Sequence, residues 1–191
     1  MSQQELLKTV SAVLDGIGRP WFLTGSMASS LQGEPRATHD SDLVVWLTAS
    51  DVTSLCDAFP WPRFLLEREA ASQAVLHRSM VSLLELETGL KVDFWIVPDE
   101  PFDRSRMERR QRVRVADFDL WVSSPEDTLV AKLRWAALAG GSEKQFRDAL
   151  RIYEVQGSAL DQGYLDRWAE ALGLMEAMAR IRREAAPASP S

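Results

Sequence analysis

A run of apolar residues in the first third of the chain places the strongest constraint on the fold. The residues that follow one another without a polar break are Leu43, Val44, Val45, Trp46 and Leu47. A strand with one face in water would alternate apolar and polar residues, so this run favours a strand that is covered on both faces. We therefore expect a central strand over residues 42–47, within a sheet that carries helices.

The local pattern changes from strands to helices at Ser124. Before it, apolar residues at helical spacing predict a helix over residues 3–17, and β-rich runs predict strands over 21–24, 80–87, 91–97, 111–116 and 120–123. We expect the 80–87 and 91–97 strands to pair as a hairpin. Ser124 and Pro125 form a helix start, after which helices are expected near 125–139, 143–156, 161–172 and 174–184. This order predicts an α+β core over residues 1–122, a helical region over 123–184 packed on the core, and a flexible tail over 185–191.

Composition narrows the functional classes. The 191 residues are 46% hydrophobic and carry a net charge of −6, which suits a globular domain and does not favour bulk binding to polyanions. One cysteine and two histidines are too few for an ordinary structural zinc site. No apolar run approaches the ~20 residues of a membrane helix, and the first residues lack the layout of a signal peptide. We expect a cytoplasmic protein without membrane contact.

A glycine and a serine after the first expected strand begin the most informative stretch. Gly25 and Ser26 lie where this strand meets a short helix, and the free N–H groups of a helix start suit a phosphate. Asp40 and Asp42 lead into the apolar run, and side chains two apart on a strand share one face. Adjacent carboxylates repel each other unless a cation compensates, and Mg²⁺ prefers carboxylate and phosphate oxygens. The stretch therefore predicts a metal-assisted phosphate site.

A third acid, Asp93, interrupts the apolar character of the expected strand 91–97. If this strand lies beside the strand of Asp42, Asp93 completes the metal site and can also act as a general base. Otherwise it is an exposed strand residue.

These motifs resemble those of the nucleotidyltransferase superfamily, the fold of DNA polymerase β-like enzymes, aminoglycoside nucleotidyltransferases and toxin-type minimal nucleotidyltransferases. The family pattern is Gly-Gly/Ser after a hydrophobic residue, then Asp-x-Asp/Glu on a strand, then a lone Asp on a later strand. The motifs Gly25-Ser26, Asp40-Ser41-Asp42 and Asp93 match this pattern in order, and Arg36 and Thr38 look like the Arg-x-Thr-x-Asp form of small bacterial members. Ser41 and Thr24 depart from the pattern, which has apolar residues at both positions.

The resemblance implies a mixed sheet with helices on one face and a C-terminal helical part. It implies an enzyme that moves a nucleoside monophosphate from an NTP such as ATP to a hydroxyl or similar acceptor, through a two-metal mechanism with Mg²⁺ or Mn²⁺. Asp40, Asp42 and Asp93 would hold the metal and carry the catalysis, while Gly25 and Ser26 would hold phosphates. The helical segments PEDTLVAKLRWA and SEKQFRDAL look like those of toxin-type members, so the resemblance also assigns nucleotide contacts to Lys132 and Asp148. It assigns a further nucleotide contact to Arg36, through the Arg-x-Thr-x-Asp form.

The acceptor stays open between RNA, a protein and an aminoglycoside-like small molecule. An antibiotic acceptor would require an acidic pocket, whereas RNA would require a basic surface near the site. A short stretch of arginines is available for the latter, although such runs are usually solvated: Arg104, Arg106, Arg109, Arg110, Arg112 and Arg114. The chain can also keep the nucleotide site without turnover, as a binding module or a partner in a toxin–antitoxin pair.

Overall fold

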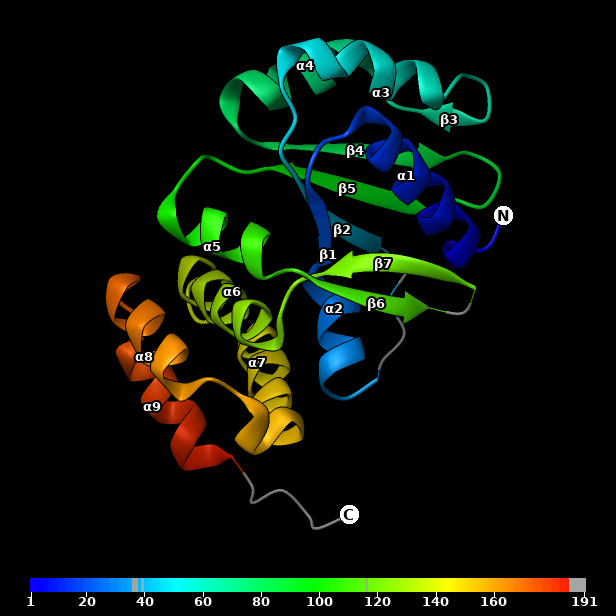
Figure 1. Cartoon of the computed structure of the whole chain (residues 1–191). Coiled ribbons are helices and arrows are strands. Elements are labelled where there is room, and N and C mark those ends of the chain that lie inside the picture. Colours follow the sequence, from blue (N-terminus) through cyan, green and yellow to red (C-terminus); the bar gives the residue numbers. More distant parts are fainter. Residues whose placement is uncertain (36–37, 39, 116, 186–191) are drawn as a thin grey trace. The chain divides into compact units, whose positions relative to one another are not determined.

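The computed structural model describes residues 1–35, 38, 40–115 and 117–185 and contains two compact units (Figure 1). The first unit comprises Met1–Thr24 and Thr38–Val122, and the second comprises Gly25–Ala37 and Ser123–Ser191. Arg36 and residues 186–191 of the predicted tail lie outside the described residues.

One mixed sheet forms the framework of the first unit. Over the described residues it has seven strands in the order β3-β4-β5-β2-β1-β7-β6 (Figure 1). Their bounds are β1 (Trp21–Thr24), β2 (Asp40–Val45), β3 (Phe64–Leu65), β4 (Met80–Glu85), β5 (Lys91–Ile96), β6 (Gln111–Val115) and β7 (Phe118–Val122). β2 runs parallel to β5 and β1 parallel to β7, and the other neighbours are antiparallel. The expected hairpin of residues 80–97 is therefore confirmed.

The apolar run supplies an inner strand, as the sequence predicts. β2 lies between β5 and β1, and Leu43, Val44 and Val45 are at most 3% exposed. The strand begins at Asp40, earlier than expected, because Asp40 already pairs with Lys91 of β5. Both acids of the Asp-Ser-Asp motif thus belong to the sheet itself.

The helices of the first unit are α1 (Gln3–Ile17), α3 (Val52–Ala58), α4 (Arg68–His77) and α5 (Pro101–Arg109), with a short 3₁₀ helix over Ala49–Asp51. α1 has the predicted bounds because its ends are well specified. Ser2 and Glu5 form a capping box at its start. Gly18 ends it with φ 75°, in the left-handed region that glycine adopts at little cost.

The two faces of the sheet are covered by different helices. Side chains alternate between the faces along a strand. α1 contacts one face through hydrogen bonds to Ser41 (3.3 Å) and from Trp21 (2.8 Å). α5 lies on the other face, where Met107 packs with Phe22 and Val44. Because the acids of β2 alternate with Ser41, they share the α5 face.

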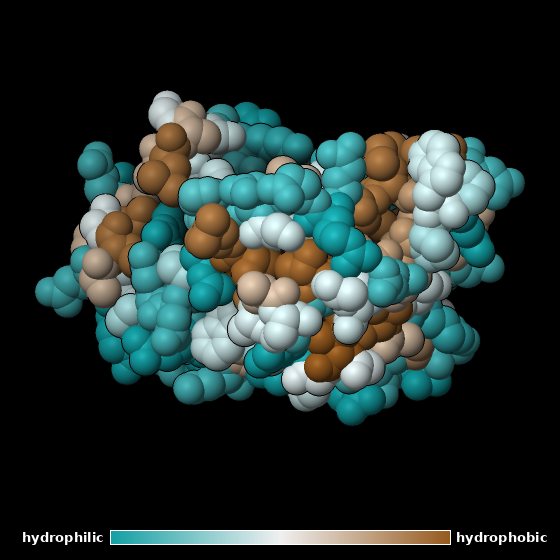
Figure 2. Space-filling model, turned by 90° about the horizontal axis from the view of Figure 1, so that it is seen from above, coloured by the Kyte–Doolittle hydropathy of each residue, from teal (hydrophilic) through white to brown (hydrophobic). Residues whose placement is uncertain are grey.

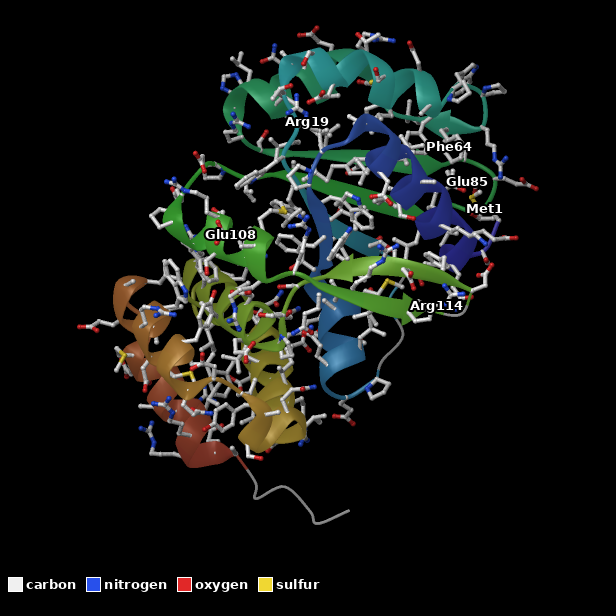
Figure 3. The ribbon with its side chains drawn as sticks, viewed as in Figure 1. Met1, Arg19, Phe64, Glu85, Glu108 and Arg114 are labelled. Carbon is white, nitrogen blue, oxygen red and sulfur yellow. The ribbon has the colours of Figure 1, made fainter. Side chains whose placement is uncertain are left out.

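α5 has no counterpart among the expected elements, and neither do α4 and β3. Its sequence, PFDRSRMER, has too few apolar residues for a helical stripe to be visible. Phe102 and Met107 are buried nevertheless, together with Asp103 and Arg106. Glu108, labelled in Figure 3, lies on the exposed side of the helix.

A buried carboxylate ties the segment after α1 to the loop after β2. Asp51 accepts hydrogen bonds from the hydroxyl of Thr48 (2.6 Å), the backbone N–H of Thr48 (2.8 Å) and Arg19 (2.8 Å); Figure 3 labels Arg19. Burial alone would raise the pKa of Asp51, but these hydrogen bonds and the charge of Arg19 together lower it below its ordinary value of 3.8. The ionised form of Asp51 is therefore the one that stabilises this connection.

The second unit is helical in its described part. Its helices are α2 (Gly25–Gln32), α6 (Pro125–Leu138), α7 (Glu143–Gln156), α8 (Gln162–Ala171) and α9 (Met175–Glu184). Ser124 caps α6 by accepting a hydrogen bond from the N–H of Asp127, as its position before Pro125 predicts. α2 packs on α6 and α7. Gly33, directly after α2, lies close to the backbone of α7. A Cβ added at this position would be only 3.1 Å from the backbone nitrogen of Ile152.

Large apolar side chains that remain exposed are scattered over several elements. They include Trp61, Leu76 and Leu138, each at least 69% exposed. Figure 2 shows hydrophobic residues in small groups on a largely hydrophilic face. Over the part of the chain that the structure describes, no helix combines the length and the apolar character that crossing a membrane requires.

Candidate functional site

Three carboxylates lie together on the α5 face of the sheet. β2 and β5 are parallel neighbours, with Asp40 opposite Lys91 and Asp42 opposite Asp93. Residues in register on neighbouring strands point to the same face, and so do residues two apart on one strand. The four side chains therefore form a square with three acidic corners and one basic corner, which we call the acid square. The adjacency of the Asp42 and Asp93 strands, on which the sequence argument depended, is confirmed.

The basic corner of the square pairs with two of the acids. The Lys91 ammonium lies 2.9 Å from Oδ2 of Asp93 and 3.8 Å from Oδ2 of Asp40. Its hydrogen bond to Asp93 is the largest influence on the pKa of Lys91 and raises it, and burial opposes this effect. The charges of Asp93, Asp40 and Asp42 raise it further. One cation therefore interacts with all three carboxylates.

Two neighbouring side chains orient the acids. Ser82 lies opposite Asp93 on β4 and donates a 2.6 Å hydrogen bond to its Oδ1. The indole N–H of Trp95 donates to Oδ1 of Asp42 at 3.0 Å. The Asp93 side chain is only 8% exposed, so its direction is set by the protein rather than by solvent.

A buried arginine of α5 borders the square. Thr24 lies opposite Asp42 in the β1–β2 register, and Arg106 donates a hydrogen bond to the Thr24 hydroxyl at 3.3 Å. The guanidinium also pairs with Asp103 at 3.2 Å and lies over the ring of Phe22, 5.0 Å from its centroid. A buried Arg106–Asp103 ion pair is therefore held at this edge of the acid-bearing face. Thr24, a departure from the family pattern, is its hydrogen-bond acceptor.

The other predicted site residues belong to the second unit. Gly25, with φ 66°, and Ser26 begin α2, directly after Thr24 in the chain. Lys132 of α6 and Asp148 of α7 pair with each other at 2.8 Å, and their side chains are 5% and 12% exposed. The roles of these four residues in nucleotide binding stay predictions. So does the role of Arg36, which lies outside the described residues.

The fold divides the arginine-rich stretch between several internal partners. On β6, Arg112 and Arg114 both pair with Asp119, at 3.3 and 3.4 Å; Figure 3 labels Arg114. Arg110 and Arg112 lie over the ring of Trp121, at 4.6 and 5.8 Å from its centroid. Arg112 and Arg114 thus share one carboxylate, and their side chains are 64% and 63% exposed.

The acid square has the donor chemistry of a divalent-metal site but not its closed geometry. Among the residues that the structure describes, no three His, Cys, Asp or Glu side chains are grouped so that they could hold a metal ion. Within the square the Lys91 ammonium contacts the oxygens of Asp93 and Asp40 instead. Carboxylate oxygens are nevertheless the hard ligands that Mg²⁺ and Mn²⁺ prefer. The donor atoms of the square are therefore of the type that suits Mg²⁺ or Mn²⁺.

The sequence interpretation missed Lys91, Ser82 and the contact of Trp95 with Asp42. One signal for Lys91 was available, because Lys-Val-Asp has the same two-residue spacing as Asp-Ser-Asp and places Lys91 on the face of Asp93. Its second partner, Asp40, depends on the register between β2 and β5. Spacing within the chain does not reveal that register.

Comparison with solved structures shows that the mixed sheet and the C-terminal helices have a nucleotidyltransferase-like fold. The chain is similar to the antibiotic-resistance factor ANT(2'')-Ia in solution, with a TM-score of 0.58 and 11% identity over 95% of this chain and 96% of that chain. The crystal structure of ANT(2'')-Ia with adenylyl-2''-tobramycin gives a TM-score of 0.59 and 11% identity over 92% of this chain and 99% of that chain.

An antigenic nucleotidyltransferase-like protein from Paracoccidioides brasiliensis has the same fold. It gives a TM-score of 0.53 and 19% identity over 94% of both chains. No family model and no curated protein sequence matches this chain. The similarity therefore lies in the three-dimensional arrangement.

Proposed function

We propose that the chain transfers a nucleoside monophosphate from an NTP to a hydroxyl or similar acceptor, with Mg²⁺ or Mn²⁺ held by Asp40, Asp42 and Asp93. The acid square carries this proposal, because three carboxylates from two neighbouring strands interact there with one cation. The similarity to ANT(2'')-Ia, one structure of which contains adenylyl-2''-tobramycin, supports nucleotide transfer as the reaction class. A cytoplasmic site of action belongs to the same proposal.

The residues of the site have distinct roles in this proposal. When bound, the divalent ion would neutralise charge on the triphosphate and polarise the reacting oxygens. Trp95 and Ser82 orient Asp42 and Asp93 before substrate arrives, so little reorganisation is needed during the reaction. Asp93 would accept the proton of the acceptor hydroxyl as a general base.

The phosphates and the nucleoside would be held by the remaining predicted residues. The N–H groups at the start of α2 and the Ser26 hydroxyl suit the phosphates. Nucleotide contacts are assigned to Arg36, Lys132 and Asp148, of which the last two already form an ion pair.

The acceptor is proposed only by class: RNA, a protein or an aminoglycoside-like small molecule. Arg112 and Arg114 share the single carboxylate of Asp119, so one of the positive charges that this strand could offer RNA is balanced within the chain. Small-molecule and protein acceptors are therefore the first to test.

The test incubates purified protein with each α-labelled NTP, Mg²⁺ and the three acceptor classes, and identifies labelled products by mass spectrometry. We expect D42N and D93N to lower transfer at least about 100-fold, because metal binding supplies several kcal/mol and ~1.4 kcal/mol is a factor of ten. Lys8→Met, which changes an exposed lysine of α1, is the control and should keep full activity. Equal transfer by wild type and D42N would refute the proposal, whereas NTP and Mg²⁺ binding without any labelled acceptor would favour a non-catalytic partner.

A further inference from the structure

We propose that Lys91 is an internal counter-ion of the acid square that competes with divalent metal ions for Asp93 and Asp40, and so sets the metal affinity of the site. This inference rests on the proposed function because it concerns the same carboxylates. It makes a separate claim, however, about how tightly a metal ion binds before any nucleotide is present.

The charges of the square create the need for such a counter-ion. Asp40, Asp42 and Asp93 place three negative charges on one face of the sheet, at two register positions separated only by the Ser41–Val92 pair. Like charges held this close are costly unless a cation compensates. The Lys91 ammonium provides that cation, at 2.9 Å from Asp93 and 3.8 Å from Asp40. Lys91 lies on the same face of the sheet as the acids, because it is in register with Asp40 and two residues before Asp93.

The surroundings of the square make Lys91 its movable member. The Asp93 side chain is 8% exposed and accepts a second hydrogen bond from Ser82, whereas the Lys91 side chain is 34% exposed. An ammonium on a flexible stem carries its charge without a fixed geometry, so it can turn towards solvent while the carboxylates stay in place. An arriving divalent ion brings twice the charge to the same oxygens, and Lys91 is the group that it displaces.

The expected size of the effect follows from the exposure of the pair. A partly exposed ion pair typically changes an equilibrium constant by a factor of about 2 to 5. We therefore expect the pairing of Lys91 with the acids to weaken metal binding by this factor. Removal of a positive charge beside the ion adds to the gain. Lys91→Met keeps an apolar stem of similar length and removes the charge, so it should strengthen metal binding by about 3-fold or more. Lys91→Arg keeps the charge and should stay close to wild type.

The experiment measures Mn²⁺ binding to the full chain without nucleotide, from the loss of the electron paramagnetic resonance signal of free Mn²⁺ in a MnCl₂ titration. K91M is expected to bind Mn²⁺ more tightly than wild type by the factor given above, and K91M/D93N should lose the gain. Lys8→Met tests for a general charge effect, because Lys8 pairs with Asp117 outside the square. As a second readout, Mn²⁺ should raise the Tm of K91M more than that of wild type, because tighter binding to the folded state stabilises it more.

An equal or weaker Mn²⁺ affinity in K91M would overturn the inference, and so would an equal gain in Lys8→Met. Lys91→Gln provides a second neutral variant if K91M does not fold. The inference and the proposed function can fail separately. Transfer that depends on Asp42, combined with equal Mn²⁺ affinity in wild type and K91M, would remove only the role of Lys91. A gain in Mn²⁺ affinity in K91M without nucleotide transfer to any acceptor would support Lys91 as the counter-ion and refute the proposed transferase activity.

Discussion

The buried ion pair between α6 and α7 gives a prediction whose magnitude follows from the structure. Lys132 and Asp148 are 2.8 Å apart, with side chains 5% and 12% exposed. Lys132→Met leaves the Asp148 carboxylate without this partner in a largely dry environment, a change that usually costs about 3–5 kcal/mol. We expect the lower end, about 3 kcal/mol, because part of Asp148 reaches solvent. With a urea dependence of about 2 kcal/mol per molar, the unfolding midpoint should fall by roughly 1.5 M.

The assay is urea unfolding followed by far-ultraviolet circular dichroism, with two comparison variants. K132M/D148L removes both charges and should return most of the lost stability, because an apolar pair of similar volume is often neutral or better. Arg147→Met removes an exposed pairing with Glu143, whose atoms are 3.8 Å apart, and should leave the midpoint unchanged. Unfolding of K132M at the wild-type midpoint, or a double variant as unstable as the single one, would contradict a stabilising role of this ion pair.

Further predictions concern other buried contacts. Because the pKa of Asp51 is lowered on folding, the stability that ionised Asp51 contributes is complete above its ordinary pKa and is lost as the pH falls through the lower folded value. D51N should therefore be less stable than wild type at pH 7 and equal to it in strong acid. A difference in unfolding free energy that does not change with pH would contradict this. Arg106→Met removes one ion-pair contact of Asp103, which is 4% exposed, and should cost about 3 kcal/mol. The Tm measured by calorimetry should then fall by at least about 6 °C, and an unchanged Tm would count against a structural role. Gly33→Ala places a Cβ 3.1 Å from the backbone of α7 and should lower the free energy of unfolding by about 1–3 kcal/mol. Gly16→Ala, with nothing within 4 Å of the new Cβ, should raise it by about 0.5–1 kcal/mol. The opposite order of stability in thermal unfolding would show that the close contact at Gly33 does not constrain the side chain.

Elements specified by local signals were predictable from the sequence. Ser2, Glu5 and Gly18 fix both ends of α1, and Ser124 with Pro125 fixes the start of α6. The apolar run of residues 43–47 indicated an inner strand for the same reason, since burial on both faces removes the need for alternation.

Features that depend on distant partners were not predictable in this way. α5 contains few apolar residues, and its buried Arg106 is stabilised by Asp103, Thr24 and the ring of Phe22, of which two lie far away in the sequence. The position of Lys91 against Asp40 requires the register of two parallel strands. Composition and spacing carry no information on that register. The acids of the site were therefore visible in the sequence, but the pairing of Lys91 with Asp40 was not.

The most direct test of the account is a crystal structure of the protein grown with MnCl₂ and a non-hydrolysable NTP analogue, with Mn²⁺ located by anomalous scattering. We expect an anomalous peak on the α5 face of the sheet, within coordination distance of oxygens of Asp42 and Asp93, and the Lys91 ammonium displaced from Asp93. Bound nucleotide with Mn²⁺ elsewhere, or with Lys91 still paired to Asp93 and no ion on these carboxylates, would contradict it.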